Sequence, residues 1–172
     1  RMQQTPGAFD VVISNAMDLQ IKLVNDGFAT QLRNLPAPDW THWRQSLFGF
    51  TAEPAAIVLN RAAFSESELP QTRQDLIRLL RANPERLRGK IATYDIRSSG
   101  LGYLFAAQDA RTSETYWRLT EVMGGLGTAL YCCSGEMIEA VASGEMLVAY
   151  NVLGSYAATQ AKSNNQIAVI LP

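Results

Sequence analysis

The second half of the chain alternates between short apolar segments and longer segments with helical spacing, and this alternation constrains the fold more than any other feature. The short segments have the length and composition of strands. Such alternation is typical of an α/β sheet with helices packed on its faces. We predict strands over residues 90–94, 129–133, 146–151 and 167–171, helices over residues 101–108, 135–143 and 155–162, and a further helix after Ser113.

The first half of the chain is less regular. Residues 9–14 form an apolar run that predicts a buried strand, and the helix predicted after it ends at Gly27. A loop rich in Pro and Trp leads to an extended run over residues 47–60, which a Glu-Pro pair interrupts. A capping-box pattern at Thr72 then begins a helix that ends before Pro84.

Composition narrows the class of partner. The chain has 172 residues, of which 47% are hydrophobic and 18% charged, so it can bury a core. A net charge of -1 provides no basic field for nucleic acid. No apolar run reaches the roughly 18 to 20 residues of a membrane span. We therefore expect neither nucleic acid nor membrane as the main partner.

The turn over residues 97–100 is the strongest candidate binding site. It follows the strand predicted over residues 90–94 and opens a helix, so its backbone N–H groups point the same way and carry the positive end of the helix dipole. Arg97 adds a planar guanidinium that suits phosphate or carboxylate. Ser98, Ser99 and Gly100 add further donors. The same Ser-Ser-Gly pattern is also an ordinary helix cap, and the sequence leaves both interpretations open.

Small or polar residues also follow the other predicted strands. In α/β sheets, ligands bind where the carboxyl ends of strands lead into helices. The candidates at these ends are Ser14, Asn15, Ser134, Gly135, Tyr150 and Asn151. Tyr150 and Asn151 fit packing at the end of the sheet equally well, and the sequence does not determine which strand ends are neighbours.

The sequence offers little for catalysis or metal binding. Its one histidine, His42, has no recognisable Ser, Cys or Asp partner pattern. Three glutamates over residues 136–145 have the spacing of a solvated helix face, and the glycines over residues 124–127 follow a helix instead of the strand that a dinucleotide-binding loop requires. We interpret the adjacent Cys132 and Cys133 as buried small hydrophobic residues, in preference to a redox or metal pair. We therefore expect a protein that is not an enzyme and holds no metal and no cofactor.

Three segments together resemble the periplasmic solute-binding proteins of bacterial ABC transporters. They are residues 10–20 (DVVISNAMDLQ), 48–60 (FGFTAEPAAIVLN) and 141–151 (VASGEMLVAYN), and they occur in the family's order around the turn at residues 97–100. The nearest branch resembles the ferric-ion-binding proteins and their relatives for phosphonates, sugar phosphates and phosphoglycerate. The similarity covers nearly the whole chain.

The resemblance implies a type II periplasmic-binding-protein-like α/β fold, mostly the second lobe with part of the first. Residues 1–50 would form part of the first lobe, residues 51–60 a crossover strand, and residues 61–172 the second lobe. A small anionic solute would bind in the cleft and pass to an ABC permease in the inner membrane. The implied ligand contacts are Ser14 and Asn15 from the first lobe, Arg97, Ser98, Ser99 and Gly100 from the second, and, more weakly, Tyr150 and Asn151.

Two departures from the family qualify these expectations. Iron-binding members carry two adjacent tyrosines a few residues after the Gly-Glu pair of the last helix, where this chain has Gly154, Ser155 and a lone Tyr156. We therefore expect an anion bearing phosphate or carboxylate as the ligand, in preference to iron(III). Family members are also considerably longer, which implies a fragment or shortened variant. Its first lobe would expose a sheet edge, for which a second copy of the chain is the candidate partner.

Two alternatives stay open. The same fold would suit a periplasmic sensing module that reports a ligand to a membrane kinase. An unrelated α/β enzyme would need a nucleophile and a base together at a strand end, and the sequence shows no such pair.

Overall fold

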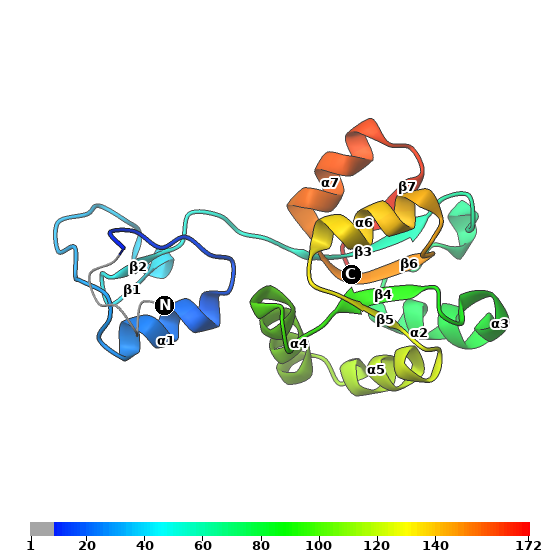
Figure 1. The fold of residues 1–172 in the computed structure, drawn as a ribbon, viewed down its shortest axis with the longest axis horizontal. Coiled ribbons are helices and arrows are strands. Elements are labelled where there is room, and N and C mark those ends of the chain that lie inside the picture. The colour runs from blue at the N-terminus through cyan, green and yellow to red at the C-terminus, as the bar shows by residue number, and fades with distance from the viewer. Residues whose placement is uncertain (1–8) are drawn as a thin grey trace. The chain divides into compact units, whose positions relative to one another are not determined.

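The computed structural model describes residues 9–172, which fall into two compact units that divide between Ala52 (the end of unit 1) and Glu53 (the start of unit 2). The elements of unit 1 are α1 (Met17–Asn25), the 3-10 helix η1 (Asp39–Thr41), β1 (His42–Trp43) and β2 (Leu47–Phe48). Those of unit 2 are β3 (Ala55–Asn60), the 3-10 helix η2 (Glu66–Glu68), α2 (Arg73–Ala82), α3 (Pro84–Leu87), β4 (Ile91–Tyr94), α4 (Gly100–Thr112), α5 (Thr115–Gly125), β5 (Ala129–Tyr131), α6 (Ser134–Ser143), β6 (Val148–Leu153), α7 (Gly154–Ser163) and β7 (Ile167–Ile170) (Figure 1).

Unit 1 consists of helix α1, a short antiparallel hairpin and connecting loops. Strands β1 and β2 pair His42 with Phe48, and Arg44 and Gln45 turn the chain with positive φ. Trp43 donates its Nε1–H to Asn25 Oδ1 at 2.9 Å, which joins the hairpin to the end of α1. The helix prediction for this region is confirmed.

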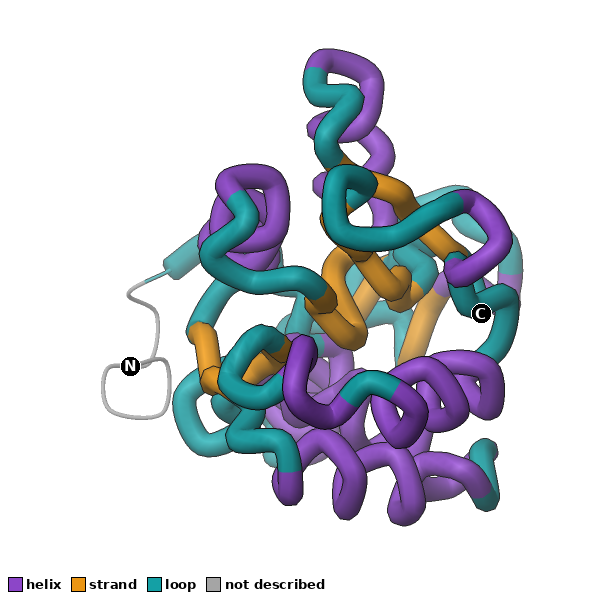
Figure 2. Tube along the Cα trace, turned by 90° about the vertical axis from the view of Figure 1, so that its right-hand side faces the viewer, coloured by secondary structure: helices purple, strands orange, loops and turns teal. Residues whose placement is uncertain are grey.

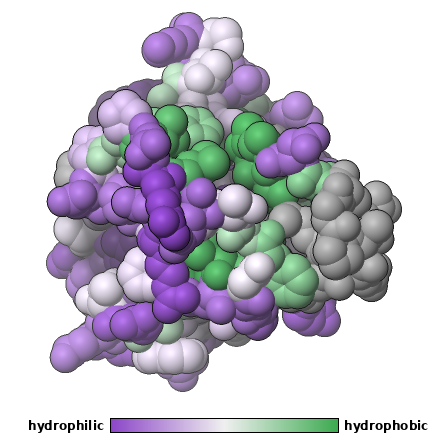
Figure 3. All heavy atoms as spheres, turned by 90° about the vertical axis from the view of Figure 1, so that its left-hand side faces the viewer, coloured by the Kyte–Doolittle hydropathy of each residue, from purple (hydrophilic) through white to green (hydrophobic). Residues whose placement is uncertain are grey.

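The buried strand predicted over residues 9–14 is wrong. The segment is irregular, and the side chains of Val11 and Ile13 are 75% and 76% exposed. A strand needs a neighbouring strand for its N–H and C=O groups. No strand pairs with this segment within residues 9–172. The prediction rested on apolar composition, which does not supply such a partner. Hydrophobic residues are visible at the surface in Figure 3.

Unit 2 is built on a five-stranded mixed sheet with the order β5-β4-β6-β3-β7. Strand β4 is parallel to both of its neighbours, β5 and β6. Strand β3 is antiparallel to both β6 and β7. The carboxyl ends of β4, β5 and β6 therefore lie at one edge of the sheet, which we call the carboxyl edge. The four strands predicted in the second half of the chain and the α/β class are confirmed.

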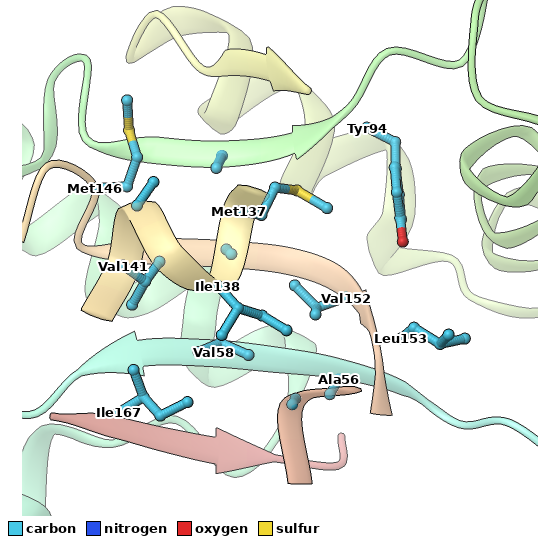
Figure 4. Packing of buried hydrophobic residues seen from close by; sticks show 14 of the residues in the cluster. Ala56, Val58, Tyr94, Met137, Ile138, Val141, Met146, Val152, Leu153 and Ile167 are labelled. Carbon is cyan, nitrogen blue, oxygen red and sulfur yellow. The ribbon is translucent and has the colours of Figure 1, made fainter. Parts of the chain in front are cut away.

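Two hydrophobic layers cover the two faces of this sheet. Strand β3 shows how they divide, because Val58 packs in one layer and the neighbouring Ile57 in the other. Residues of α6 and α7 join the first layer, which Figure 4 shows at close range, and residues of α2, α3 and α5 join the second. The strands of unit 2 lie between these helices in Figure 2. Burial on both faces explains why β3 is apolar without alternation.

The capping box predicted at the start of α2 is confirmed. Thr72 Oγ1 accepts from the Asp75 N–H at 3.1 Å, and the Asp75 carboxylate accepts from the Thr72 N–H at 3.0 Å. The helix ends before Pro84, as its sequence predicts. No helix over residues 9–172 is long and apolar enough to cross a membrane.

Candidate functional site

Three helices begin at the carboxyl edge of the sheet. Helices α4, α6 and α7 start at Gly100, Ser134 and Gly154, after the ends of β4, β5 and β6. The first N–H groups of a helix lack partners inside it and carry the positive end of its dipole. Side-chain caps differ among the three: Ser99 Oγ accepts from the Gly102 N–H at 3.1 Å, whereas α6 and α7 have no side-chain cap. The first N–H of α7 is already used, because Gly154 donates to Pro54 O at 2.8 Å, so the edge offers an anion the other N–H groups at these helix starts.

Ser134 ties this edge together. Its Oγ accepts from the Leu153 N–H at 3.0 Å and forms a hydrogen bond with the Tyr94 hydroxyl. The Asp95 N–H also donates to Tyr131 O at 2.8 Å, which joins the ends of β4 and β5. Ser134 is 6% exposed, so it positions the strand ends and is not itself open to a ligand. The starts of the three helices are thus held by contacts between strands.

Arg97 lies in the turn after β4, where its side chain is 80% exposed and paired with Asp95. Its Nε and Nη2 donate to the two carboxylate oxygens of Asp95, each at 2.9 Å, and its backbone N–H donates to Asp95 Oδ1 at 3.0 Å. The hydrogen bonds from Arg97 hold the pKa of Asp95 below its ordinary value, and those to Asp95 raise the pKa of Arg97. One side of the guanidinium fork is therefore occupied by a carboxylate of the same turn.

Sequence reasoning missed Asp95. The signal was present, because an Asp two residues before a turn residue accepts from that residue's N–H in an Asx-turn. Asp95 makes this bond to Arg97. An anion that binds this turn must compete with the Asp95 carboxylate for Arg97.

Ser98, Ser99 and Gly100 form the rest of this turn. The N–H groups of Ser98 and Ser99 both donate to Asp95 O, at 3.1 and 2.9 Å, and Ser99 caps α4. Ser98 is exposed and Ser99 buried. Among the hydrogen bonds described for the chain, none comes from the N–H of Gly100 or Leu101. These two groups are the donors that the turn leaves for a ligand.

Tyr150 and Asn151 lie inside strand β6 and not at the strand exit that the sequence predicts, because β6 continues to Leu153. The two residues are 2% and 5% exposed. The Tyr150 hydroxyl donates to Asp109 Oδ2 at 2.5 Å, and Asn151 Nδ2 donates to the same oxygen at 3.0 Å. Arg73 donates from Nη2 to Asp109 Oδ1 at 2.9 Å and from Nε to the Tyr150 oxygen at 3.0 Å. We call these four residues the Asp109 network. It matches the packing interpretation of Tyr150 and Asn151.

Ser14 and Asn15 belong to unit 1 and are exposed. Ser14 Oγ accepts from the Ala16 N–H at 3.1 Å, one residue before α1 begins. The two residues therefore precede a helix, as the sequence predicts, but no strand leads into them within the described residues.

Comparison with known proteins places this architecture. No family model and no curated protein matches the sequence. Among solved structures, the substrate-binding protein of the ABC transporter from Agrobacterium tumefaciens is 36% identical, with a TM-score of 0.88 over 92% of this chain and 48% of that one. Iron-bound HitA from Pseudomonas aeruginosa is 20% identical, with a TM-score of 0.64 over 88% of this chain and 49% of that one.

The fold is that of the type II periplasmic solute-binding proteins. The resemblance stated from the sequence is thereby confirmed. A two-component system protein that mediates signal transduction shares the fold at 18% identity, with a TM-score of 0.57 over 84% of this chain and 46% of that one. The chain spans about half the length of these proteins.

Within this solute-binding fold, the interpretation of Cys132 and Cys133 as buried residues is wrong. Strand β5 ends at Tyr131, so both cysteines lie in the loop before α6, where both are exposed and joined by a disulfide. The glutamates over residues 136–145 are exposed, as their helical spacing predicts. The glycines over residues 124–127 follow the body of helix α5 and not a strand, which agrees with the sequence interpretation.

Proposed function

We propose that this chain belongs to the solute-binding component of an ABC importer and captures a small anion bearing phosphate or carboxylate in the periplasm. The 36% identity to a transporter's substrate-binding protein supports the role. The observation that carries the ligand class is the start of three helices at one edge, two of them without a side-chain cap. Such a protein binds its solute and then releases it to a permease in the inner membrane, and no covalent bond is made or broken.

In this proposal Arg97 is the recognition residue, and the N–H groups of Gly100 and Leu101 hold the anion beside it. Asp95 weakens the site, because a ligand must take over donors that Asp95 occupies. Ser14 and Asn15 remain proposed contacts through the sequence resemblance alone. The geometry thus favours an anion that accepts several hydrogen bonds at once over a monovalent halide.

Iron(III) lies outside the proposal, although HitA is iron-bound. Desolvation and the hydrogen bond to Asp109 raise the pKa of Tyr150, so its phenol stays protonated where an iron ligand must be a phenolate. Tyr156 is exposed, and no second tyrosine adjoins it. A hard trivalent cation therefore finds no paired phenolates at this edge.

A thermal-shift series tests the proposal. Phosphate, methylphosphonate, a sugar phosphate, a dicarboxylate and iron(III) are added separately, since a ligand that binds the native state raises the melting temperature. We expect one anion class to stabilise the protein, Arg97→Ala to abolish the shift, and Asp95→Asn to enlarge it. Arg111→Ala, at the far end of α4, is the matched control. A shift that survives Arg97→Ala would refute the site, and a shift with iron(III) alone would refute the ligand class.

A sensing module that reports to a membrane kinase is the second candidate. The shared fold of a two-component system protein favours it as a second choice. A permease gene beside the coding gene would support import, and a kinase gene would support sensing. Pairing of two copies through a sheet edge is a separate prediction, and light scattering of the purified chain tests it.

A further inference from the structure

The loop between β5 and α6 brings three metal-binding groups together. Cys132 and Cys133 are adjacent and exposed, with Cα atoms 3.8 Å apart and a disulfide between their sulfurs. Glu136 lies in the first turn of α6, and its Oε2 is 3.6 Å from Cys132 Sγ. The two Sγ atoms and one carboxylate oxygen all lie within 4.8 Å of one another. Once the disulfide is broken, this loop offers three ligand atoms to one small ion.

The start of α6 lies beside these groups. Cys133 is the N-cap residue of α6, where no side chain caps the helix, and the positive end of the helix dipole favours an anionic thiolate. Glu136 takes part in none of the ion pairs found over residues 9–172. Its carboxylate is therefore not committed to a neighbouring cation.

We propose that Cys132, Cys133 and Glu136 form a redox-gated site for a thiophilic divalent ion such as Zn²⁺ or Cd²⁺. Two thiolates and a carboxylate select such ions over Mg²⁺ or Ca²⁺, which prefer oxygen ligands alone. Three protein ligands leave a fourth position for water or for another ligand. The proposal departs from the expectation that the chain holds no metal, and it does not rest on the proposed function.

The redox dependence follows because the same two sulfurs form the disulfide in the oxidised chain and bind the metal ion in the reduced chain. In the oxidised chain the two sulfurs bond to each other, and neither is a thiolate. A dithiol reductant breaks the S–S bond by donating two electrons and two protons, and becomes a disulfide itself. The metal ion then displaces the two thiol protons and binds both sulfurs with the Glu136 carboxylate. The disulfide and the metal complex therefore exclude each other.

Cadmium titration tests the site, because Cd²⁺–thiolate bonds absorb in the ultraviolet. The protein is reduced with a phosphine, freed of reductant without air, and titrated in parallel with the oxidised protein. We expect the reduced protein to bind one Cd²⁺ with a thiolate band and the oxidised protein to bind none. Cys132→Ser and Cys133→Ser should each remove the tight site. Circular dichroism checks that each variant is folded.

A matched pair of glutamates separates the carboxylate ligand from general surface charge. Glu136→Gln should weaken Cd²⁺ binding at least about 10-fold, because even the loss of a residue that only hydrogen-bonds to a metal ligand lowers metal affinity by about this factor. Glu139→Gln, exposed on the same helix, should leave the affinity unchanged. Equal effects of the two substitutions would refute Glu136 as a ligand.

Two outcomes would overturn the rest of the proposal. If the reduced wild-type chain shows no thiolate band, or the serine variants bind Cd²⁺ as tightly as it does, the cysteines do not form a metal site. If the intact mass after air oxidation still shows two free thiols, the gate is refuted.

Discussion

The turn after β4 and strand β6 both carry polar residues near the carboxyl edge of the sheet, yet these residues differ in exposure. Arg97 and Ser98 stay exposed, whereas Tyr150 and Asn151 are buried in the Asp109 network. The difference comes from the partners. Arg97 pairs with Asp95 within its own turn, while Tyr150 bonds to a carboxylate from α4 and to Arg73 at the start of α2. A polar residue near this edge is open to ligand only where distant elements leave it uncovered.

Removing the centre of the Asp109 network should have the largest effect on stability. Asp109→Ala leaves Arg73, whose side chain is 22% exposed, without its carboxylate partner and removes the acceptor of Tyr150 and Asn151. Breaking a fully buried pair costs about 3 to 5 kcal/mol, and we expect a loss near the lower value because Arg73 is only partly buried. Urea denaturation measures the free energy of unfolding. Asp95→Ala, which breaks the exposed pair, is the control and should change it far less. Equal losses would contradict the contrast between the two regions.

The residue that follows β6 gives a second, smaller test. A Cβ at position 154 would lie 2.7 Å from both Pro54 Cγ and Pro54 O, so Gly154→Ala must displace the chain before β3. We expect a loss of about 1 to 3 kcal/mol, typical of overpacking. At Gly135, in the first turn of α6, a Cβ meets nothing within 4 Å, so Gly135→Ala is the matched control and should be neutral or slightly stabilising. Similar results for the two glycines would show that the end of β6 is not tightly packed.

Alkaline pH should distinguish the buried residues of β6 from the exposed turn. Desolvation and the bond to Asp109 raise the pKa of Tyr150 above its ordinary value of about 10. Below about pH 10 the Tyr150 hydroxyl is protonated in the folded and the unfolded chain alike. Above that pH the unfolded chain loses the proton first, so the free energy of unfolding falls by up to about 1.4 kcal/mol per pH unit. Tyr150→Phe should reduce this slope. Tyr103→Phe, an exposed tyrosine of α4, is the control, and a slope that Tyr150→Phe leaves intact would contradict the assignment.

The smallest effect concerns the exposed pair. Hydrogen bonds from Arg97 lower the pKa of Asp95, so the pair contributes stability above the ordinary Asp value of about 3.9 and loses it as pH falls through the lower folded value. Because the Arg97 side chain is 80% exposed, the contribution is small, and NMR titration of the Asp95 carboxyl measures it better than unfolding does. Arg97→Ala should return the pKa toward its ordinary value. No change would mean that the pair does not persist in solution.

Local patterns predicted much of unit 2 because they are properties of neighbouring residues. Helical spacing located α2, α4, α6 and α7, and the capping box at Thr72 fixed the start of α2. Residues 9–14 misled because an apolar run does not reveal whether another strand pairs with it. Cys132 and Cys133 misled because β5 ends two residues earlier than its composition suggests.

The candidate site was only partly predictable for a related reason. The turn at residues 97–100 could be located from its own residues, and Asp95 could have been added from its spacing to Arg97. The burial of Tyr150 depends on Asp109 and Arg73, which are far away in the sequence. Such contacts follow from the packing of α4 and α2 around the sheet and leave no local pattern.

The place of β3 in the sheet has a consequence for how the chain folds. It is the first strand of unit 2 to be synthesised, yet both of its hydrogen-bonded neighbours, β6 and β7, come from the last part of the sequence. Pairings of such long range close large loops and slow folding. Strand β3 therefore gains its neighbouring strands only after β6 and β7 have been synthesised. A nascent chain that stops before Val148 would leave the apolar side chains of β3 without either neighbouring strand.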